Sequence, residues 1–241
     1  MSWAINYHRW ILEIFLPYLG QHIVEVGAGV GSFSELILTE HKFQTLSLVE
    51  PSEDLYEQLQ ARMLSPGANM KVDLFHGSFR EAAPLIKSQR VIDSVIYINV
   101  LEHIAEDEQE LDLVKDILSP SGHVLLFVPA LRWLYGTYDQ QLGHFRRYTK
   151  TELEGKLRRA GFRIIRSNYF DFPGIVPWWV KYRLLKSLTL EPGAVKFYDQ
   201  FIVPVVRRIE SFAPPPIGKN IIVVAQKSED RSGRTGLRPR A

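Results

Sequence analysis

The stretch HIVEVGAGVGSFS, residues 22–34, decides how the rest of this chain is organised. An apolar run ends in three alternate glycines, Gly27, Gly29 and Gly31, and apolar residues at helical spacing resume at Phe33. The pattern predicts a buried strand, a tight turn and a helix. Glycine lets the backbone adopt a positive φ and lets a ligand approach without a Cβ in the way, and the first turn of a helix offers free N–H groups. A nucleotide-like ligand fits such a turn.

A second signal is an acidic residue, Glu50, which ends the apolar run of residues 45–49. An acidic side chain about 20 positions beyond such glycines can accept hydrogen bonds from both hydroxyls of a ribose. Dinucleotide dehydrogenases carry G-x-G-x-x-G, whose third glycine packs the helix on the strand. Here the spacing from Glu25 is E-x-G-x-G-x-G, and Ser32 follows the last glycine, so the dehydrogenase pattern is missed by one residue.

The stretch EVGAGVG, residues 25–31, followed by LVEPS, residues 48–52, resembles the first two motifs of class I S-adenosylmethionine-dependent methyltransferases. The resemblance implies an α/β fold with a Rossmann-like, doubly wound seven-stranded sheet, in which an antiparallel last strand is inserted near one edge. It also implies S-adenosyl-L-methionine as cofactor and S-adenosyl-L-homocysteine as product. The alternative is a turn that merely needs glycine. The implied cofactor-binding residues are Glu25, Gly27, Gly29, Gly31, Glu50, Pro51, Gly77, Ser78, Phe79, Asn99, Val100 and Leu101.

Two later stretches extend the resemblance. In the family, the turn at residues 76–79 borders the adenine, with an acidic residue where Ser78 stands here; the serine hydroxyl or its N–H can still bond the adenine edge. The run NVLEH, residues 99–103, is close to the equivalent segment of small-molecule methyltransferases. An amino-methylating nucleic-acid enzyme would carry Asn-Pro-Pro-aromatic here, and a cytosine C5 enzyme would need a cysteine, which this sequence lacks.

Composition indicates one domain. With 241 residues, of which 46% are apolar, the chain can build one large core, and we expect a single methyltransferase domain over residues 1–227 and a disordered tail over residues 228–241. The absence of cysteine excludes disulfides, thiolate metal sites and thiol nucleophiles. Polar residues interrupt the N-terminal apolar stretch, which argues against a signal peptide or a membrane span there. We therefore expect a cytoplasmic enzyme.

The charges are unevenly spread along the chain. The net charge of +2 combines −10 for residues 1–131 with +9 for residues 132–208 and +3 for the remainder. A basic surface attracts phosphate, acidic sugar, anionic lipid or nucleic acid. The alternative is surface charge dispersed over the second half of the chain.

Hydrophobic periodicity gives the remaining elements. Residues 3–19 read as an amphipathic helix that caps the cofactor pocket, with Tyr7 and Trp10 either touching ligand or, as we favour, packing on the core. Residues 118–123 read as a turn and residue 151 as a helix start. The strands expected beyond residue 50 cover residues 72–75, 91–99, 124–129, 162–170 and 220–227.

A loop without a regular period, residues 135–149, follows the fifth expected strand and so lies at the carboxyl edge of the sheet, where open α/β folds bind ligands. Its D…GHFRRYT-x-x-EL pattern resembles a bacterial methyltransferase subgroup linked to cell-surface glycan and lipid-linked sugar biosynthesis. The alternative is a loop anchored by its own histidine and arginines. The candidate substrate-binding residues are Tyr138, Arg146, Arg147 and Tyr148.

Methyl transfer to an alcohol needs a general base, for which histidine is the usual choice. His144 is the first candidate, Asp139 orients it or acts alone, and His103 is the reserve. Arg146 and Arg147 are suited to an anionic group on the acceptor. No arrangement of Asp, Glu and His in the sequence suggests a metal, so no metal site is expected.

Residues 171–218 form a long helical insertion before the last expected strand. From Phe197 to Ile209 the apolar residues share one helix face and the polar residues the other, and Pro204 is expected to kink the helix. The insertion is a lid over the substrate, a dimer face, or an element lying on anionic membrane. Lid is the preferred interpretation, and the oligomeric state is open.

The sequence thus predicts an O-methyltransferase acting on a small or lipid-linked acceptor that can contain sugar. One alternative is a catalytically silent S-adenosylmethionine-binding protein that holds a partner through the insertion. Another is an RNA methyltransferase that uses the basic half, which predicts steeply salt-dependent RNA binding. We rank it low because no RNA-binding module is recognisable, so nucleic acid is not an expected partner.

Overall fold

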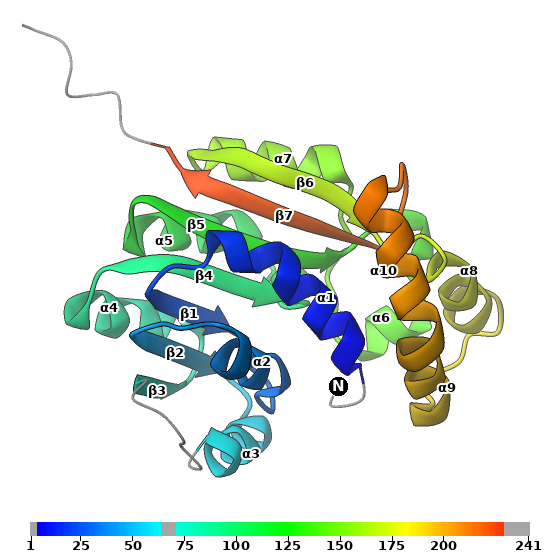
Figure 1. Cartoon of the computed structure of the whole chain (residues 1–241), viewed down its shortest axis with the longest axis horizontal. Helices are drawn as coiled ribbons and strands as arrows, with labels where there is room; N and C mark the ends of the chain where they lie inside the picture. Colours follow the sequence, from blue (N-terminus) through cyan, green and yellow to red (C-terminus); the bar gives the residue numbers. More distant parts are fainter. Residues whose placement is uncertain (1–3, 64–70, 229–241) are drawn as a thin grey trace, which may run out of the picture.

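The computed structural model describes residues 4–63 and 71–228. Its centre is a seven-stranded sheet in the order β3-β2-β1-β4-β5-β7-β6 (Figure 1). Neighbouring strands are parallel, except that β7 runs antiparallel to both β5 and β6. The strands are β1 (His22–Val26), β2 (Thr45–Glu50), β3 (Lys71–His76), β4 (Ile92–Ile98), β5 (Leu118–Pro129), β6 (Phe162–Phe170) and β7 (Asn220–Lys227). The expected doubly wound fold with an inserted antiparallel last strand is confirmed.

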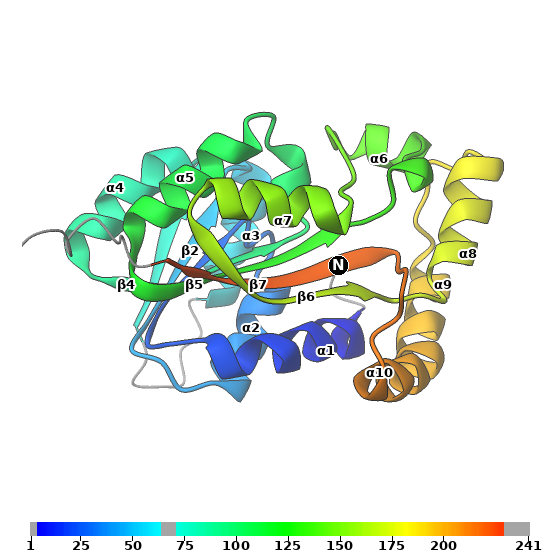
Figure 2. The same ribbon diagram turned by 90° about the horizontal axis from the view of Figure 1, so that it is seen from above.

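Helices cover both faces of the sheet (Figure 2). One core cluster includes residues of α1 (Ile5–Phe15), α2 (Ser32–Glu40) and α3 (Glu53–Met63). The other includes residues of α4 (Phe79–Gln89), α5 (Asp107–Ile117) and α7 (Lys150–Arg159). Neighbouring strand residues alternate between the clusters, as Ile23 and Val24 do in β1, which is why the central strands read as continuous apolar runs.

Strand boundaries agree with expectation except at β5. The ends of β6 and β7 are as expected, and each end of β3 and β4 differs from its expected position by one residue. The expected turn at residues 118–123 is wrong, because β5 starts at Leu118, which is 2% exposed and pairs with Ile92. The register shifts between Ile92 and Ser94, and Ser121 has a φ of +63°. Burial of Leu118 therefore joins to the strand a segment whose Ser-Pro-Ser-Gly composition favours a turn.

The N-terminal helix is shorter than predicted. It covers Ile5–Phe15 and is followed by a 3₁₀ turn, Leu16–Tyr18; Trp3 and residues 229–241 of the expected tail lie outside the described residues. Tyr7 and Trp10 pack against the ring of Phe170, with centroid separations of 5.3 and 3.7 Å. The two rings therefore belong to the core, the role that we favoured for them.

The 135–149 loop is more regular than the sequence suggested, because it holds a short helix, α6 (Thr137–Gln141), after a 3₁₀ turn at Arg132–Leu134. The insertion is helical throughout most of its length, as expected. Its elements are α8 (Ile175–Trp178), a π-helical stretch (Trp179–Leu184), α9 (Pro192–Phe197), a second π-helical stretch (Tyr198–Ile202) and α10 (Val203–Phe212). Pro204 lies in the first turn of α10, directly after the second π-helical stretch.

The insertion meets the N-terminal helix through a polar residue. Asp199, on the face expected to be polar, is 4% exposed and accepts hydrogen bonds from the backbone N–H groups of Asn6 and Tyr7, at 3.1 and 2.8 Å. Val203 and Val206 are buried in the core beside it, whereas the row Phe197, Phe201, Val205 and Ile209 is exposed at the surface. None of the helices in the described part of the chain is long and apolar enough to cross a bilayer.

Candidate functional site

The three glycines of the turn after β1 have different surroundings, although all have positive φ. A Cβ on Gly27 would meet the side chain of Val100 at 2.4 Å, so this glycine is required for packing. A Cβ on Gly31 would meet Met63 and Leu59 of α3 within 3.0 Å. A Cβ on Gly29 would meet nothing within 4 Å. The space in front of Gly29 is therefore open to a ligand.

Glu50 closes this turn from the end of β2. Its Oε2 accepts a hydrogen bond from the N–H of Gly29 at 2.7 Å, and its Oε1 accepts one from the N–H of Ser52 at 2.9 Å. The side chain is 4% exposed. Because a carboxylate has about four lone-pair sites, two remain for further donors such as ribose hydroxyls. The next residue, Pro51, is exposed.

Glu25 lies within β1, beneath the turn, and is almost fully buried. The Ser34 hydroxyl donates a hydrogen bond to its Oε2 at 2.6 Å. Burial is the main reason why the pKa of Glu25 is raised to about 7, and the charge of nearby Glu50 raises it further. The folded protein therefore keeps a proton on Glu25 between about pH 4.5 and pH 7, where the unfolded chain has released it.

The residues expected near the adenine have local roles. Ser78 is the N-cap of α4: its Oγ accepts from the N–H of Glu81 at 3.3 Å, and its own N–H donates to the Glu81 carboxylate at 2.8 Å. Phe79 is 3% exposed and packs on Tyr97 in the core. Gly77 has a φ of +133°. Cofactor contacts at this turn therefore stay a prediction.

The segment after β4 supports the glycine turn from the neighbouring strand. Asn99 has a φ of +51°, and its N–H donates to the carbonyl of Phe127 at 2.8 Å. Val100 contacts the position of Gly27, as described above, and Leu101 is fully buried. The bend at Asn99 thus carries the chain from β4 into the 3₁₀ turn Leu101–His103.

Asp139 and His144, from the 135–149 loop, form a buried pair. The imidazole Nδ1 of His144 lies 2.9 Å from Oδ1 of Asp139. The same Oδ1 accepts from Nε of Arg147 at 2.8 Å, and Oδ2 accepts from the N–H of Gly136 at 3.0 Å. Burial acts to raise the pKa of Asp139, but these donors outweigh it, and the net pKa is lowered. Both oxygens of Asp139 are thus engaged, and the carboxylate holds the His144 ring in place.

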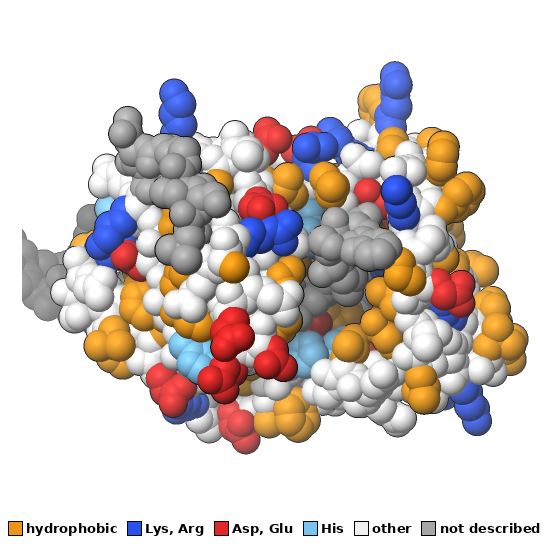
Figure 3. All heavy atoms as spheres, turned by 90° about the horizontal axis from the view of Figure 1, so that it is seen from below, with side chains coloured by type: hydrophobic (Ala, Val, Ile, Leu, Met, Phe, Trp, Pro, Cys, Tyr) orange, Lys and Arg blue, Asp and Glu red, His pale blue; other side chains and the backbone are white. Residues whose placement is uncertain are grey.

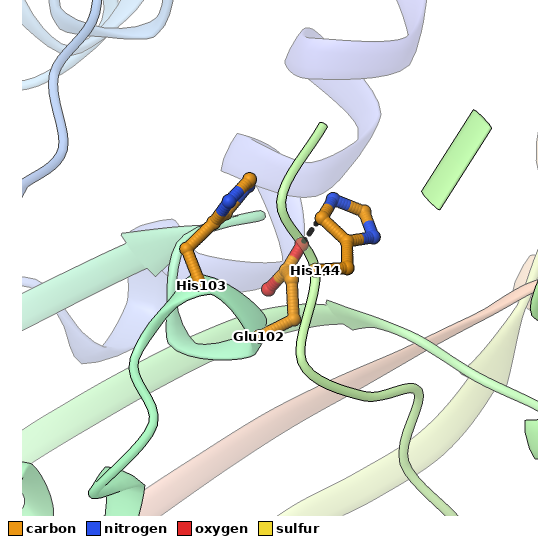
Figure 4. Close-up of side chains that lie close together, drawn as sticks. All are labelled: Glu102, His103 and His144. Atoms are coloured by element: carbon orange, nitrogen blue, oxygen red, sulfur yellow. Dashed lines mark ion pairs between the residues drawn. The ribbon is translucent and has the colours of Figure 1, made fainter. Parts of the chain in front are cut away.

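Across from this pair, the NVLEH segment brings two further ionisable side chains (Figure 4). The Nε2 of His144 is 3.9 Å from Oε1 of Glu102, and the rings of His103 and His144 are 4.5 Å apart in an edge-to-face arrangement. Burial raises the pKa of Glu102 to about 8, whereas burial and His144 lower that of His103. The three expected acid–base residues, His144, Asp139 and His103, are thus brought together.

Two of the expected substrate-binding residues are structural anchors. Tyr148 is fully buried, and its hydroxyl donates to Oδ2 of Asp107 at 2.8 Å. Arg147 is 2% exposed and holds Asp139 and the carbonyl of Ala130. Burial of both side chains argues against direct contact with a substrate, and these two assignments stay predictions.

Arg146 and Tyr138 lie nearer to the surface. Arg146 forms an ion pair with Asp107 at 2.9 Å, so its charge is already partly compensated. The ring of Tyr138 stacks on Tyr182, with centroids 4.6 Å apart, and meets Trp178 edge to face at 5.8 Å. The α8 part of the insertion therefore packs on the 135–149 loop beside His144.

A cavity of about 580 Å³ lies elsewhere, between α1, β6 and α10, and its lining includes Trp10, Phe170, Arg166 and Arg208. It contains none of the residues at the carboxyl ends of β1, β4 and β5. The chemistry belongs at that carboxyl edge, because the glycine turn, the NVLEH segment and the 135–149 loop all follow strand ends there.

Comparison with known proteins agrees with this geometry. Residues 6–167 match a family model described as a methyltransferase domain. The chain belongs to this methyltransferase family. It is accordingly an S-adenosylmethionine-dependent methyltransferase, as the resemblance implied. A search of curated proteins found no match.

Solved methyltransferases share the fold at low sequence identity. An S-adenosylmethionine-dependent methyltransferase from Archaeoglobus fulgidus aligns with a TM-score of 0.59 and 16% identity, covering 93% of this chain and 95% of that one. One from Mesorhizobium loti gives 0.58 and 15%, covering 93% and 98%. Phosphoethanolamine N-methyltransferase 2 from Haemonchus contortus, solved with S-adenosyl-L-methionine, gives 0.60 and 18%, covering 93% and 53%.

The residues of this methyltransferase fit the cofactor. The open space at Gly29 admits a ligand against the backbone, and Glu50 keeps lone pairs beside it. Helix α2 starts without a side-chain cap, which leaves N–H groups of its first turn for a polar ligand group. When bound, the cofactor supplies an electrophilic methyl group.

Sequence reasoning missed Glu102 as a site residue. Its neighbour His103 was singled out, and Glu102 was read only as part of the NVLEH run. The signal that could have found it is its place next to His103 at a strand end, because side chains there converge on the carboxyl edge.

Proposed function

We propose that this methyltransferase transfers the methyl group to an oxygen of a small or lipid-linked, sugar-containing acceptor. The observation that carries the proposal is the Asp139–His144 pair at the carboxyl edge of the sheet. An alcohol must lose its proton as its oxygen attacks the methyl carbon, and a positioned histidine can accept that proton.

Asp139 determines which nitrogen of His144 is available. Its carboxylate is ionised, because its pKa is lowered, and so favours the tautomer with the proton on Nδ1. Nε2 then carries a lone pair directed away from Asp139. The ion pair of Asp139 with Arg147 and the N–H of Gly136 keep the carboxylate in place. Deprotonation of the acceptor therefore depends on His144, with Asp139 as its positioning residue.

The aromatic side chains that pack on the 135–149 loop support a sugar-containing acceptor. Tyr138 and the residues Trp178 and Tyr182 of the insertion form an aromatic cluster next to the loop. The guanidinium of Arg147 lies 4.8 Å from the Trp178 ring and fixes its position from beneath. Aromatic faces of this kind pack against the apolar faces of a ring while leaving its hydroxyls free. The α8 part of the insertion thus serves as a lid.

Replacing His144 by glutamine tests the proposal, with His123→Gln, on β5, as a matched control. We expect His144→Gln to lower turnover by about a hundredfold or more, the usual scale for a general base, and to leave the affinity for S-adenosylhomocysteine within twofold, as calorimetry would measure it. His123→Gln should change neither. An equal loss of cofactor binding in His144→Gln would make the residue a structural anchor and refute its proposed role.

The outer face of the insertion supports a membrane location. Phe197, Phe201, Val205 and Ile209 follow one another at four-residue steps, and each is between 58% and 63% exposed. Hydrophobic side chains gather on this side of the molecule (Figure 3). An apolar surface of this extent marks an interaction site.

Charge favours an anionic membrane as the partner of this face. The exposed cations on the insertion are Arg183, Lys186, Lys196 and Arg208. An exposed apolar row flanked by cations is typical of an element that lies in the interface of an anionic membrane. We therefore propose that the inner face of the insertion closes over the acceptor site, while its outer face rests on the bilayer that contains a lipid-linked acceptor.

A further inference from the structure

We propose that Glu102, His103 and His144 bind a divalent transition-metal ion in the acceptor site. The inference deepens the proposed function, on which it rests, because it concerns how the acceptor hydroxyl is held and deprotonated. It departs from the sequence-based expectation of no metal. The three residues come from two segments that are 41 positions apart and meet only in the folded chain (Figure 4).

The donor atoms are already close together. Each residue offers one ligand atom, and the three atoms lie within 4.8 Å of one another. Among residues 4–63 and 71–228, Glu102, His103 and His144 form the one group of three acidic or histidine side chains whose ligand atoms lie this close together. Ligand bonds of about 2.0 to 2.1 Å to a tetrahedral ion place its ligands roughly 3.3 Å apart. The exposed side chain of His103 can supply the required contraction by rotating about its own bonds.

The second observation is a buried carboxylate without a partner. Glu102 is fully buried, and neither Oε1 nor Oε2 has a hydrogen-bond partner. Its closest described basic group is Nε2 of His144, at 3.9 Å, which is too far for a hydrogen bond. A buried carboxylate is retained when it is paired or when it coordinates a metal. A cation between Glu102 and the two imidazoles would give this carboxylate the partner that it lacks.

Both histidines are held as metal ligands usually are. Nδ1 of His144 lies against the carboxylate of Asp139, and His103 has a backbone hydrogen bond to Leu142. Histidine ligands commonly donate their second ring N–H to a carboxylate or a backbone carbonyl, which fixes the tautomer and makes the other nitrogen a better donor. Arg147 anchors Asp139 in turn. Each imidazole thus keeps one nitrogen for a cation.

The ligand types favour Zn²⁺ over Mg²⁺, because two imidazole nitrogens join one carboxylate. Three protein ligands leave a coordination position for an acceptor hydroxyl, and a cation there lowers the pKa of that hydroxyl. The hydroxyl proton leaves to solvent. The oxygen then forms its bond to the methyl carbon as the carbon–sulfur bond breaks, with its electron pair going to sulfur. In this state the cation activates the acceptor hydroxyl, and His144 acts as one of the ligands of the cation.

The test is direct metal binding to the full chain, stripped with a chelator and then titrated with Zn²⁺ by calorimetry and with Mn²⁺ by electron paramagnetic resonance. We expect one ion per chain. Glu102→Gln and His103→Ala should each weaken binding at least tenfold, and Asp139→Asn should weaken it by about 10- to 100-fold without removing a ligand. Glu110→Gln is the matched control: it removes a buried carboxylate that already has a partner, Tyr97, and should bind metal as the wild type does.

Absence of stoichiometric binding by the wild type, or wild-type affinity in both Glu102→Gln and His103→Ala, would overturn the inference. If Glu102→Gln does not fold, His103→Ala decides alone, because its side chain is exposed and retained S-adenosylhomocysteine binding reports an intact fold. Full turnover of the metal-free wild type together with an inactive His144→Gln variant would overturn the metal site and preserve the proposed function. Metal binding without any O-methylated product would do the reverse.

Discussion

Replacing Gly29 by alanine should separate cofactor binding from stability. Gly29 has a φ of +57°, so alanine there costs about 1 to 2 kcal/mol of folding free energy, but the added Cβ meets no protein atom within 4 Å. The Cβ does enter the open space that we assign to the cofactor. Such overlap costs about 1 to 3 kcal/mol, which corresponds to an affinity loss of roughly 5- to 150-fold. Calorimetric titration with S-adenosylhomocysteine measures that loss, and urea unfolding measures the stability.

Gly143→Ala is the matched control, because Gly143 has a φ of +74° and equally open space around its Cβ position. It should lower stability as much as Gly29→Ala does and leave cofactor affinity unchanged. Gly27→Ala should be the least stable of the three variants, since its Cβ would meet Val100 at 2.4 Å. Wild-type affinity in a folded Gly29→Ala variant would refute the assignment of the cofactor to this turn.

Three further predictions concern other parts of the molecule. Because the pKa of Glu25 is raised to about 7, its ionisation opposes folding increasingly as pH rises from about 4.5 to 7. The unfolding free energy of Glu25→Gln, relative to that of the wild type, should therefore increase by about 2 to 3 kcal/mol between pH 5 and pH 8. A difference that does not depend on pH would contradict this. The wild type should co-sediment with anionic liposomes, and Phe201→Ser with Ile209→Ser should release it, whereas Leu85→Ser on α4 should not; equal sedimentation of all three proteins would exclude the membrane face. Tyr148→Phe leaves Asp107 without one donor and should lower stability by about 1 kcal/mol in urea unfolding with unchanged cofactor affinity, whereas a selective rise in acceptor KM would return Tyr148 to the substrate site.

The sequence predicted the fold well where backbone pattern alone decides it. Alternate glycines after an apolar run can form only a few turns, and the apolar runs of β6 and β7 are bounded by clear turn residues. The start of β5 was missed because its first residues favour a turn and join the strand only through the burial of Leu118. Local composition does not record that tertiary contact.

The sequence predicted which residues form the candidate site better than it predicted what each residue does there. Asp139, His103 and His144 meet as expected, but residue type could not tell that Tyr148 and Arg147 point into the interior. The period from Phe197 to Ile209 likewise gave two faces without saying which one is covered. Asp199 bonds α1, so the expected polar face is covered there and the row that contains Phe201 stays exposed, a choice made by contacts between residues almost 200 positions apart in the sequence.

Transfer of an isotopically labelled methyl group tests the central claim most directly. The purified enzyme is incubated with trideuteromethyl S-adenosylmethionine and bacterial membrane lipids that carry lipid-linked sugars, and mass spectrometry locates the label. We predict a label on an acceptor oxygen, one S-adenosylhomocysteine for each product molecule, and loss of the product in His144→Gln. A label on nitrogen or carbon, or tight cofactor binding with no labelled product from any acceptor, would contradict O-methyl transfer at this site.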